Sequence, residues 1–291
     1  MSQVFLPHTL DELWTKKQEN PAALIMAGGT DLLVKIRDRK LPPAVILGLE
    51  NIAELRQIEQ QDEEICIGSM VTHQQLLDSP IIQTQLPVLH QAVAVLGSPP
   101  IRHMGTIGGN ICTASPAGDT LPPLYVLNAG LELKNAAASR LLLIKDFIRG
   151  PGQTLLSSNE ILYKIRIPIP APHSPGFYFK VGQRKALAIS IISMACLLQL
   201  AEDNRILDGR FAWGSTGPTV MRFPEVENTL IGEKLSPIVL GKLGQSMAAL
   251  VSPISDIRAS AEYRRLLVSK LPLKIWQSHF SSLSAASGHG D

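Results

Sequence analysis

Cysteine is scarce in this sequence, with three residues among 291. Cys66, Cys112 and Cys196 stand far apart and share no spacing typical of a zinc site or a disulfide framework. An iron–sulfur cluster is commonly held by four thiolates. The chain therefore cannot hold such a cluster with four thiolates of its own, and no metal site is predicted.

The sequence also lacks a charge bias and a long hydrophobic run. Its formal net charge is +2, without a dense basic segment, which argues against a nucleic-acid partner. The longest apolar stretch, residues 186–200, is interrupted by polar side chains, so it is too short to span a bilayer and is typical of a long buried strand. No secretory signal is visible, and we expect a soluble, cytoplasmic protein.

The common nucleotide and catalytic motifs are missing. The glycines at 105, 108 and 109 do not match GxGxxG, and no GxxxxGK[ST] or HExxH pattern occurs. His103 is the one histidine beside a glycine-rich stretch, but a lone histidine near a loop is more often a structural donor than a base. No catalytic residue is predicted.

Two glycine stretches are the most informative feature that is present. One is Ala27-Gly28-Gly29-Thr30-Asp31, and the other is residues 106–119 with Gly108 and Gly109. Adjacent glycines permit a bend whose successive N–H groups form a concavity for phosphate oxygens. Asp119 can accept hydrogen bonds from ligand hydroxyls, although an Asp here is also a candidate helix N-cap. Two such bends predict one extended dinucleotide ligand.

A hydrophobic content of 45% and a charged content of 18% are typical of a globular chain that buries a core. Apolar runs predict strands at 22–26, 44–47, 65–68, 131–133, 141–143 and 161–167. Helices are expected after Thr9, at 71–77 with Thr72 as N-cap, and at 86–96 and 119–127. This mixture predicts an α/β or α+β core, to which Leu32, Leu33, Val34 and Ile36 are expected to contribute.

Four prolines between 168 and 175 mark the clearest break in the chain. Beyond it, antiparallel strands are expected at 177–181, 189–200 and 210–213, with amphipathic helices at 235–250 and 260–270. Together these segments predict a second α+β domain. The polar tail at 281–291 is expected to be disordered.

Residues 27–33 and 101–111 resemble the two FAD-binding signatures of the molybdenum hydroxylases. The chain is similar to the separate medium subunit of bacterial xanthine dehydrogenases and carbon monoxide dehydrogenases. Glu160-Ile161-Leu162, Phe179-Lys180 and residues 257–265 also occur in the family's order, so the resemblance covers nearly the whole chain.

The resemblance implies an α+β protein. A two-lobed FAD-binding domain of the PCMH type would occupy residues 1–170, with lobes at about 1–57 and 58–170. A proline-rich linker would follow at 171–176. A smaller domain of the carbon monoxide dehydrogenase flavoprotein type, an antiparallel sheet with helices, would occupy 177–277, before a flexible tail at 278–291.

The resemblance also implies a set of FAD-binding residues. Thr113 and Asp119 would contact the ribityl chain, Leu162 would lie near the flavin ring, and Lys180 would reach its polar edge. A cation at that edge would stabilise reduced, anionic flavin. The residues implied for the pyrophosphate are Ala27, Gly28, Gly29, Thr30, Asp31, Leu32, Thr106, Gly108, Gly109 and Asn110.

In function, the resemblance implies an FAD-dependent electron-transfer subunit that is active only in a complex. Partner chains, a small iron–sulfur subunit and a large molybdenum-cofactor subunit, would pass electrons through FAD to NAD or another acceptor, in a dimer of heterotrimers. Three positions depart from the family's pattern: Leu96, Pro100 and Ala188. Many members carry Asp where this chain has Ala188, which argues against NAD as the acceptor.

Two alternatives remain open at the level of the sequence. One is a docking or assembly subunit that kept the fold and lost its flavin, against which the intact pair of glycine stretches argues. The other is a stand-alone FAD reductase similar to the enolpyruvyl-sugar reductases. That enzyme would need its own proton donor near the flavin, and the sequence offers no clear candidate.

Overall fold

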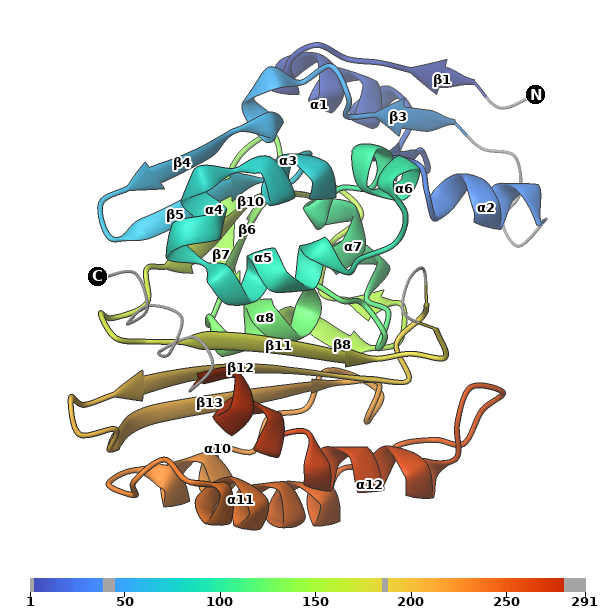
Figure 1. Ribbon diagram of the computed structural model, residues 1–291. Coiled ribbons are helices and arrows are strands. Elements are labelled where there is room, and N and C mark those ends of the chain that lie inside the picture. Colours follow the sequence, from blue (N-terminus) through green and yellow to red (C-terminus); the bar gives the residue numbers. More distant parts are fainter. Residues whose placement is uncertain (1–2, 39–44, 185–187, 280–291) are drawn as a thin grey trace.

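The N-terminal segment forms a small parallel sheet in the computed structural model, which describes residues 3–38, 45–184 and 188–279. Its strands are β1 (Val4–Phe5), β2 (Leu24–Met26) and β3 (Ile46–Gly48), in the order β1-β3-β2. Helix α1 (Leu10–Glu19) packs on this sheet, and α2 (Leu32–Arg37) follows β2 (Figure 1). The sheet thus delivers the first glycine stretch at the carboxyl end of β2.

Helix α1 begins as the sequence predicts. The hydroxyl of Thr9 accepts a hydrogen bond from the N–H of Glu12, at 3.2 Å. The carboxylate of Glu12 accepts from the N–H of His8 at 2.8 Å, one residue before the N-cap. Leu10, Leu13 and Trp14 are buried along one face of the helix.

A five-stranded antiparallel sheet forms the centre of the first domain. Its order is β4 (Ile58–Gln61), β5 (Glu64–Gly68), β10 (Ile161–Pro168), β6 (Gly130–Lys134) and β7 (Ser139–Leu143). One face is polar and carries ion pairs such as Arg166 to Glu132, at 2.7 Å. The opposite face packs against helices. These are α3 (His73–Asp78), α4 (Pro80–Gln85), α5 (Pro87–Ala94), α7 (Ile107–Thr113) and α8 (Leu121–Val126), whereas α6 (Pro99–Met104) buries none of its residues and lies beside α3.

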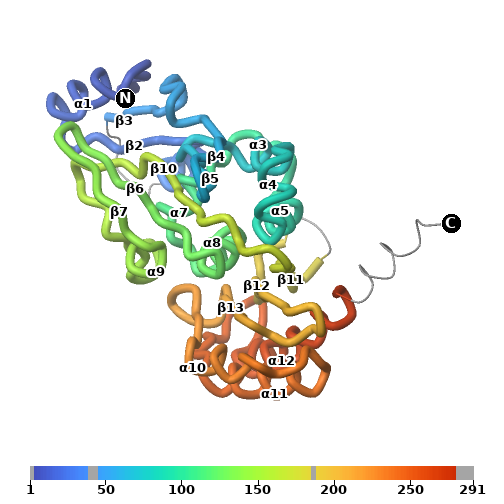
Figure 2. The backbone as a smooth tube through the Cα atoms, turned by 90° about the vertical axis from the view of Figure 1, so that its left-hand side faces the viewer, coloured from blue at the N-terminus to red at the C-terminus, as the bar shows by residue number. Residues whose placement is uncertain are grey.

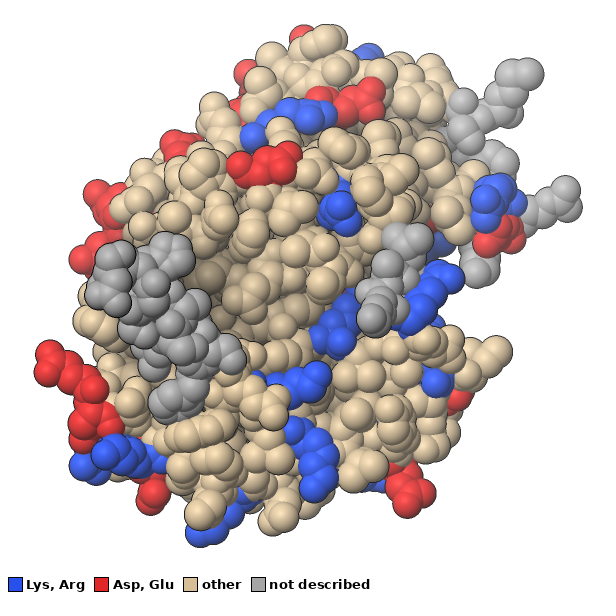
Figure 3. Space-filling view, in the orientation of Figure 1, with Lys and Arg blue, Asp and Glu red and all other residues tan. Residues whose placement is uncertain are grey.

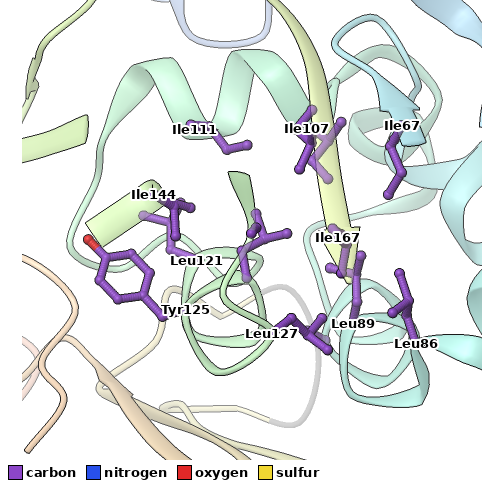
Figure 4. Packing of buried hydrophobic residues seen from close by; sticks show 14 of the residues in the cluster. Ile67, Leu86, Leu89, Ile107, Ile111, Leu121, Tyr125, Leu127, Ile144 and Ile167 are labelled. Atoms are coloured by element: carbon purple, nitrogen blue, oxygen red, sulfur yellow. The ribbon is translucent and has the colours of Figure 1, made fainter. Parts of the chain in front are cut away.

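The core between this sheet and its helices fixes the orientation of α7. Ile107 and Ile111, four residues apart and therefore on one face of the helix, are fully buried. They point into the cluster that also contains Ile167 and Leu121 (Figure 4). The remaining short elements are η1 (Ala53–Arg56), α9 (Ile144–Phe147), β8 (Ile148–Gly150) and β9 (Gln153–Thr154).

The second domain contains an antiparallel sheet of β11 (Gly176–Val181), β12 (Ile192–Leu200) and β13 (Ile206–Gly214). The sheet lies between α5 and α8 of the first domain and the helices of the second (Figure 1), and Figure 2 shows the two domains one above the other. The helical elements of the second domain are α10 (Pro224–Glu227), η2 (Asn228–Leu230), α11 (Pro237–Leu250) and α12 (Ala261–Lys270).

Strand β12 is buried on both faces, which explains its continuous apolar sequence. Ala195 and Leu197 join the core of the first domain, whereas Met194, Cys196 and Leu198 pack toward α11 and α12. A strand covered on both sides does not need to alternate apolar and polar residues. The predicted α+β class is confirmed.

Two expectations about local structure were wrong. Leu33 and Val34 are exposed rather than in the core, because α2 buries none of its side chains among the described residues. The stretch expected to bend around Gly108 and Gly109 is the first part of helix α7. Two helices that begin at the proline of a Ser-Pro pair, α4 and α6, were not predicted at all. The tail at 281–291 lies outside the described residues. Residue 44 of the strand expected at 44–47 and residues 185–187 also lie outside them.

Candidate functional site

The two glycine stretches lie against each other in space. A Cβ atom at Gly28 would lie 1.6 Å from the carbonyl oxygen of Met104 and 3.2 Å from the Cα of Gly105. Gly29 has a φ of +70°, which a residue with a side chain rarely adopts. Glycine is therefore required here for two physical reasons: close approach of two backbones and a left-handed conformation.

The first glycine stretch presents free backbone donors. Among the described residues, the N–H groups of Gly28, Gly29, Thr30 and Asp31 have no hydrogen-bond partner in the protein. The carbonyls of Gly29 and Asp31, in contrast, accept bonds from Leu33 and Lys35 at the start of α2. Four consecutive unpaired N–H groups suit an anionic ligand that only accepts hydrogen bonds.

The second stretch differs from the expected phosphate-binding bend. Its N–H groups are paired inside the protein: that of Ile107 with Val71 O, that of Gly108 with Ser69 O, and that of Gly109 with Thr106 Oγ1, each at 3.0 Å. The expectation of exposed N–H groups at Gly108 and Gly109 was therefore wrong. The cause is that Thr106 caps α7 while the segment after β5 runs alongside it.

A cavity of about 370 Å³ lies between the two stretches, and we call it the glycine cavity. Every residue in the predicted site lines it except Asp119 and Lys180. These lining residues are Ala27, Gly28, Gly29, Thr30, Asp31, Leu32, Thr106, Gly108, Gly109, Asn110, Thr113 and Leu162.

Polar side chains join the walls of the glycine cavity. The hydroxyl of Thr113 donates to Asp31 Oδ2 at 3.1 Å, and the same carboxylate oxygen lies 2.7 Å from Lys35 Nζ. Asn110 accepts at Oδ1 from the hydroxyl of Thr120, at 2.7 Å. Thr113 and Asp31 thus hold α7 and the first glycine stretch together, and Asn110 keeps its amide N–H₂ as the donor available to a ligand.

Ser69, His73 and Cys112 are among the residues of the glycine cavity that were not in the predicted site. The hydroxyl of Ser69 and the Nδ1 of His73 are buried without a hydrogen-bond partner in the described structure. Burial, with a smaller contribution from Arg102, lowers the pKa of His73 to about 4, so its ring is neutral at pH 7. Burial raises the pKa of Cys112 to about 12, so this side chain remains a thiol.

A second cavity, of about 690 Å³, lies between the two domains, and we call it the interdomain cavity. Leu96 and Asn110 line both cavities, so the two cavities are adjacent. Asp119 lines the interdomain cavity from the first domain, and Arg258 and Arg264 line it from the second. On the face in Figure 3, Lys and Arg side chains gather across the middle, whereas most Asp and Glu lie nearer the edges.

The two arginines of the interdomain cavity are held by one carboxylate. Arg264 Nη2 and Arg258 Nη1 lie 2.7 and 2.8 Å from oxygens of Asp256. Burial raises the pKa of Asp256, but the hydrogen bonds that it accepts from Arg258, Arg264 and Ala259 outweigh this and lower the pKa overall. The Nε of Arg264 is buried and has no partner among the described residues.

Asp119 and Lys180 form a buried ion pair that links the domains. Lys180 Nζ lies 2.6 Å from Asp119 Oδ2, and the hydroxyl of Tyr178 donates to Oδ1 at 3.0 Å. Helix α8 begins at Leu121 with Thr120 as its N-cap, so the alternative of Asp119 as N-cap was wrong. Burial raises the pKa of Asp119, although Lys180 and Tyr178 act in the opposite direction.

Leu162 and Lys180 lie on different cavities. Leu162, in β10, lines the glycine cavity near Leu156 and Glu160. Lys180 lines a separate pocket at the domain junction, as does Ala188. The two side chains expected near the same flavin ring therefore line different cavities.

Such an architecture, a glycine-lined cavity that shares lining residues with a cavity between two α+β domains, fits a two-domain flavoprotein. The sequence matches the family described as "FAD binding domain in molybdopterin dehydrogenase" over residues 1–170. Residues 177–279 match the "CO dehydrogenase flavoprotein C-terminal domain". The chain belongs to this family of molybdenum-hydroxylase flavoprotein subunits; its cofactor is FAD, and it is an oxidoreductase subunit.

Curated relatives and solved structures agree with this assignment. The chain is 34% identical to the xanthine dehydrogenase FAD-binding subunit of Escherichia coli O157:H7 over 259 residues, 88% of each chain. It is 30% identical to the nicotinate dehydrogenase FAD-subunit of Eubacterium barkeri, over 90% of each chain. A carbon monoxide dehydrogenase structure from Hydrogenophaga pseudoflava superimposes with a TM-score of 0.89 at 25% identity, covering 94% of this chain and 95% of that one.

Two further findings concern metal-ligating side chains and membrane-spanning helices. The three cysteines are free thiols in β5, α7 and β12, and no group of metal-ligating side chains assembles within the described ranges. None of the helices in residues 3–38, 45–184 and 188–279 has both the length and the apolar character needed to cross a membrane.

Proposed function

We propose that this chain carries electrons through FAD from an iron–sulfur subunit to an acceptor, within a complex whose third chain holds a molybdenum cofactor. The family match supports the cofactor. The observation that carries the proposal at the site is the row of four unpaired N–H groups from Gly28 to Asp31, in a cavity that shares Leu96 and Asn110 with the cavity between the domains.

The residues present fit a dinucleotide. The pyrophosphate would bind the N–H groups of residues 28–31, with the amide of Asn110 and the hydroxyl of Thr106 nearby. Thr30, Leu32, Gly108 and Gly109 would complete this wall. Ala27 lines the cavity too, and a Cβ atom at Gly109 would lie 3.0 Å from Thr106 Oγ1, a tight contact, and at an ordinary contact distance of 3.7 Å from the Ala27 Cβ.

The two ends of the ligand would occupy the two cavities. At the domain junction, Asp119 would contact the ribityl chain and Lys180 would contact the polar edge of the flavin. Thr113, which lines the glycine cavity, would also contact the ribityl chain. Leu162 would then face the adenine end, because it lies in the glycine cavity away from the Asp119–Lys180 pair. This proposal differs from the contact with the flavin ring that the resemblance implies for Leu162, and it is supported by the separate cavities that Leu162 and Lys180 line.

FAD, when bound, would supply the redox chemistry by accepting and releasing electrons. The chain's own residues would orient it and set its potential: Lys180 would place a positive charge near the pyrimidine edge, and Asp119 would hold that charge in position. Apolar residues such as Leu96 and Ile189, which line the interdomain cavity, would limit the access of water.

The electron acceptor and the organic substrate are separate questions. Relatives of similar identity are named for xanthine, nicotinate and nicotine, so similarity to this chain does not select a substrate. Ala188 lines the interdomain cavity with no charge where many family members carry Asp. We therefore favour an acceptor other than NAD, in a complex that we propose to be a dimer of heterotrimers acting in the cytoplasm.

Purification of the full-length chain tests the central part of this proposal. It should be yellow, release FAD and not FMN on denaturation, and rebind FAD more tightly than FMN because only FAD offers a pyrophosphate. A colourless protein that does not bind FAD would contradict the proposal and favour a docking or assembly subunit. Addition of NADH should leave the bound flavin oxidised. Rapid reduction of the flavin by NADH would contradict this expectation and support NAD as the acceptor.

A further inference from the structure

The glycine cavity has few charged side chains for a ligand that contains a pyrophosphate. The charged residues among those that line it are Asp31, Lys35 and Glu160. Glu160 is held by Arg140 of β7, whose Nε lies 2.7 Å from Glu160 Oε1. His73 also lines the cavity, but burial lowers its pKa to about 4, so its ring is neutral at pH 7. Among the described lining residues, the positive charge of this cavity is therefore that of Lys35.

Lys35 lies where the first glycine stretch meets α7. Its backbone N–H donates to Asp31 O at 3.1 Å, at the start of α2. Its Nζ lies 2.7 Å from Asp31 Oδ2, the oxygen that also accepts from the hydroxyl of Thr113 at 3.1 Å. The Lys35 side chain is 43% exposed, so a ligand in the cavity can approach it. An ammonium group has three donors, and Asp31 is the one partner of Nζ in the described part of the chain.

We propose that Lys35 Nζ binds a phosphate oxygen of FAD while it stays paired with Asp31. This inference rests on the proposed function and deepens it, because it adds a cation to the row of backbone N–H groups at residues 28–31. A pyrophosphate is anionic and accepts hydrogen bonds, and the flexible four-carbon stem of lysine lets one ammonium group serve two acceptors. Lys35 lies outside both glycine stretches, so their pattern does not reveal it.

The alternative role of Lys35 is an ordinary ion pair within a helix, which stabilises a chain little when it is exposed. The pair of Lys16 and Glu19 in α1 is such a case. Its side chains are 38% and 51% exposed, compared with 43% and 46% for Lys35 and Asp31. Neither Lys16 nor Glu19 lines the glycine cavity. Helix α2 buries none of its side chains among the described residues, so replacement of Lys35 should leave the fold intact.

The test measures binding of FAD and of ADP to the full-length chain freed of flavin, at low ionic strength. Lys35→Gln is expected to weaken both ligands about 3- to 10-fold, the range for a partly exposed contact to a charged group. The loss should shrink as the salt concentration rises, because salt screens exposed charges. Lys35→Arg keeps the charge and should bind FAD within about 2-fold of the wild type. Lys16→Gln is the matched control and should leave both affinities unchanged.

The variant Asp31→Asn separates a contact with phosphate from neutralisation of the Asp31 charge. The amide oxygen of the new side chain can still accept from the hydroxyl of Thr113. If Lys35 only offset a carboxylate that repels phosphate, Lys35→Gln would leave FAD binding unchanged in the Asp31→Asn background, and the inference would be overturned. With a direct contact, Lys35→Gln should weaken FAD binding there at least as much as in the wild type, because the ammonium group is no longer shared with a carboxylate.

The outcomes separate this inference from the function on which it rests. If the wild-type chain binds FAD and Lys35→Gln binds it as tightly, the inference is overturned while the proposed function stands. Weaker FAD binding with undiminished ADP binding would overturn the assignment to the phosphates. An equal loss in Lys35→Arg and Lys35→Gln would show that the charge does not act, which also overturns it. A wild-type chain that fails to bind FAD would instead remove the proposed function. Urea unfolding without ligand should give midpoints close to that of the wild type for the Lys35 and Lys16 variants.

Discussion

Lys180 Nζ and Asp119 Oδ2 lie 2.6 Å apart, in side chains that are each 10% exposed. Lys180 comes from β11 of the second domain, and Asp119 precedes α8 of the first. The pair therefore joins the two domains where the interdomain cavity begins. The hydroxyl of Tyr178 completes the set by donating to the other oxygen of the carboxylate.

Removal of one partner of this pair should destabilise the protein strongly, because the other charge is then left buried. We expect Asp119→Asn to lower the free energy of unfolding of the flavin-free chain by about 3 kcal/mol or more. The double variant Asp119→Asn/Lys180→Met should lose less unfolding free energy than the sum of the losses in the two single variants. Urea unfolding of the four members of the cycle measures the coupling, and additivity within about 0.5 kcal/mol would contradict it. Glu19→Gln, which removes an exposed pair with Lys16, should change little.

The charge of Lys180 should also affect the bound flavin. Lys180→Met is expected to lower the reduction potential of FAD, because a cation near the pyrimidine edge stabilises the reduced, anionic form. Potentiometric titration of the flavin-loaded chain measures the shift. Lys274→Met is the control: Lys274 is exposed and lines the same pocket at the domain junction, where solvent screens its charge. Equal potentials in both variants would place Lys180 away from the ring.

The approach of the two glycine stretches can be tested at Gly28. We expect Gly28→Ala to abolish FAD binding and to destabilise the chain, because the new Cβ would overlap the carbonyl oxygen of Met104, a backbone atom that cannot rotate away. Gly241→Ala in α11 is a matched control, since its Cβ would meet nothing closer than 3.8 Å. That control should raise the stability by about 0.5–1 kcal/mol. Normal FAD binding by Gly28→Ala would refute the close contact.

The sequence was sufficient to predict this pair of stretches but not their different roles. Two adjacent glycines look alike in both places. In the first, Gly29 has a positive φ and the N–H groups stay free, whereas in the second Thr106 and the backbone of Ser69 pair the N–H groups of Gly109 and Gly108. That difference depends on the neighbouring segment after β5, which no local pattern reveals.

Ser69 and His73 escaped prediction for the same reason. Their place in the cavity depends on the pairing of residues 69–73 with residues 105–108, a tertiary contact without a motif of its own. Leu33 and Val34 show the opposite error, because apolar residues after a buried strand suggest a core that the short helix α2 does not enter. Strand β10 and helices α11 and α12 were predictable because their apolar patterns are long and regular.

The pair of Arg140 and Glu160 gives a prediction about pH. Hydrogen bonds from Arg140 lower the pKa of Glu160 to about 2, from an ordinary value of 4.5. The folded chain therefore binds this proton less tightly than the unfolded chain, so the stabilisation is complete above pH 4.5 and declines as the pH falls toward 2. The difference in unfolding free energy between wild type and Glu160→Gln, measured without flavin, should shrink over that interval. A constant difference down to pH 2 would contradict the pKa shift.

The last prediction concerns the partner chains. In the proposed relay, another chain oxidises the organic substrate and passes the electrons to the flavin of this chain, whose three cysteines are separate free thiols in β5, α7 and β12. The isolated, FAD-loaded chain should be reduced by dithionite but not by purines, aldehydes or carbon monoxide. Addition of the iron–sulfur and molybdenum subunits should make flavin reduction dependent on the substrate of the complex. The measurement is the loss of flavin absorbance under anaerobic conditions. Reduction by an organic substrate with this chain alone would refute the relay and favour a stand-alone reductase, because the electrons would then enter the flavin directly.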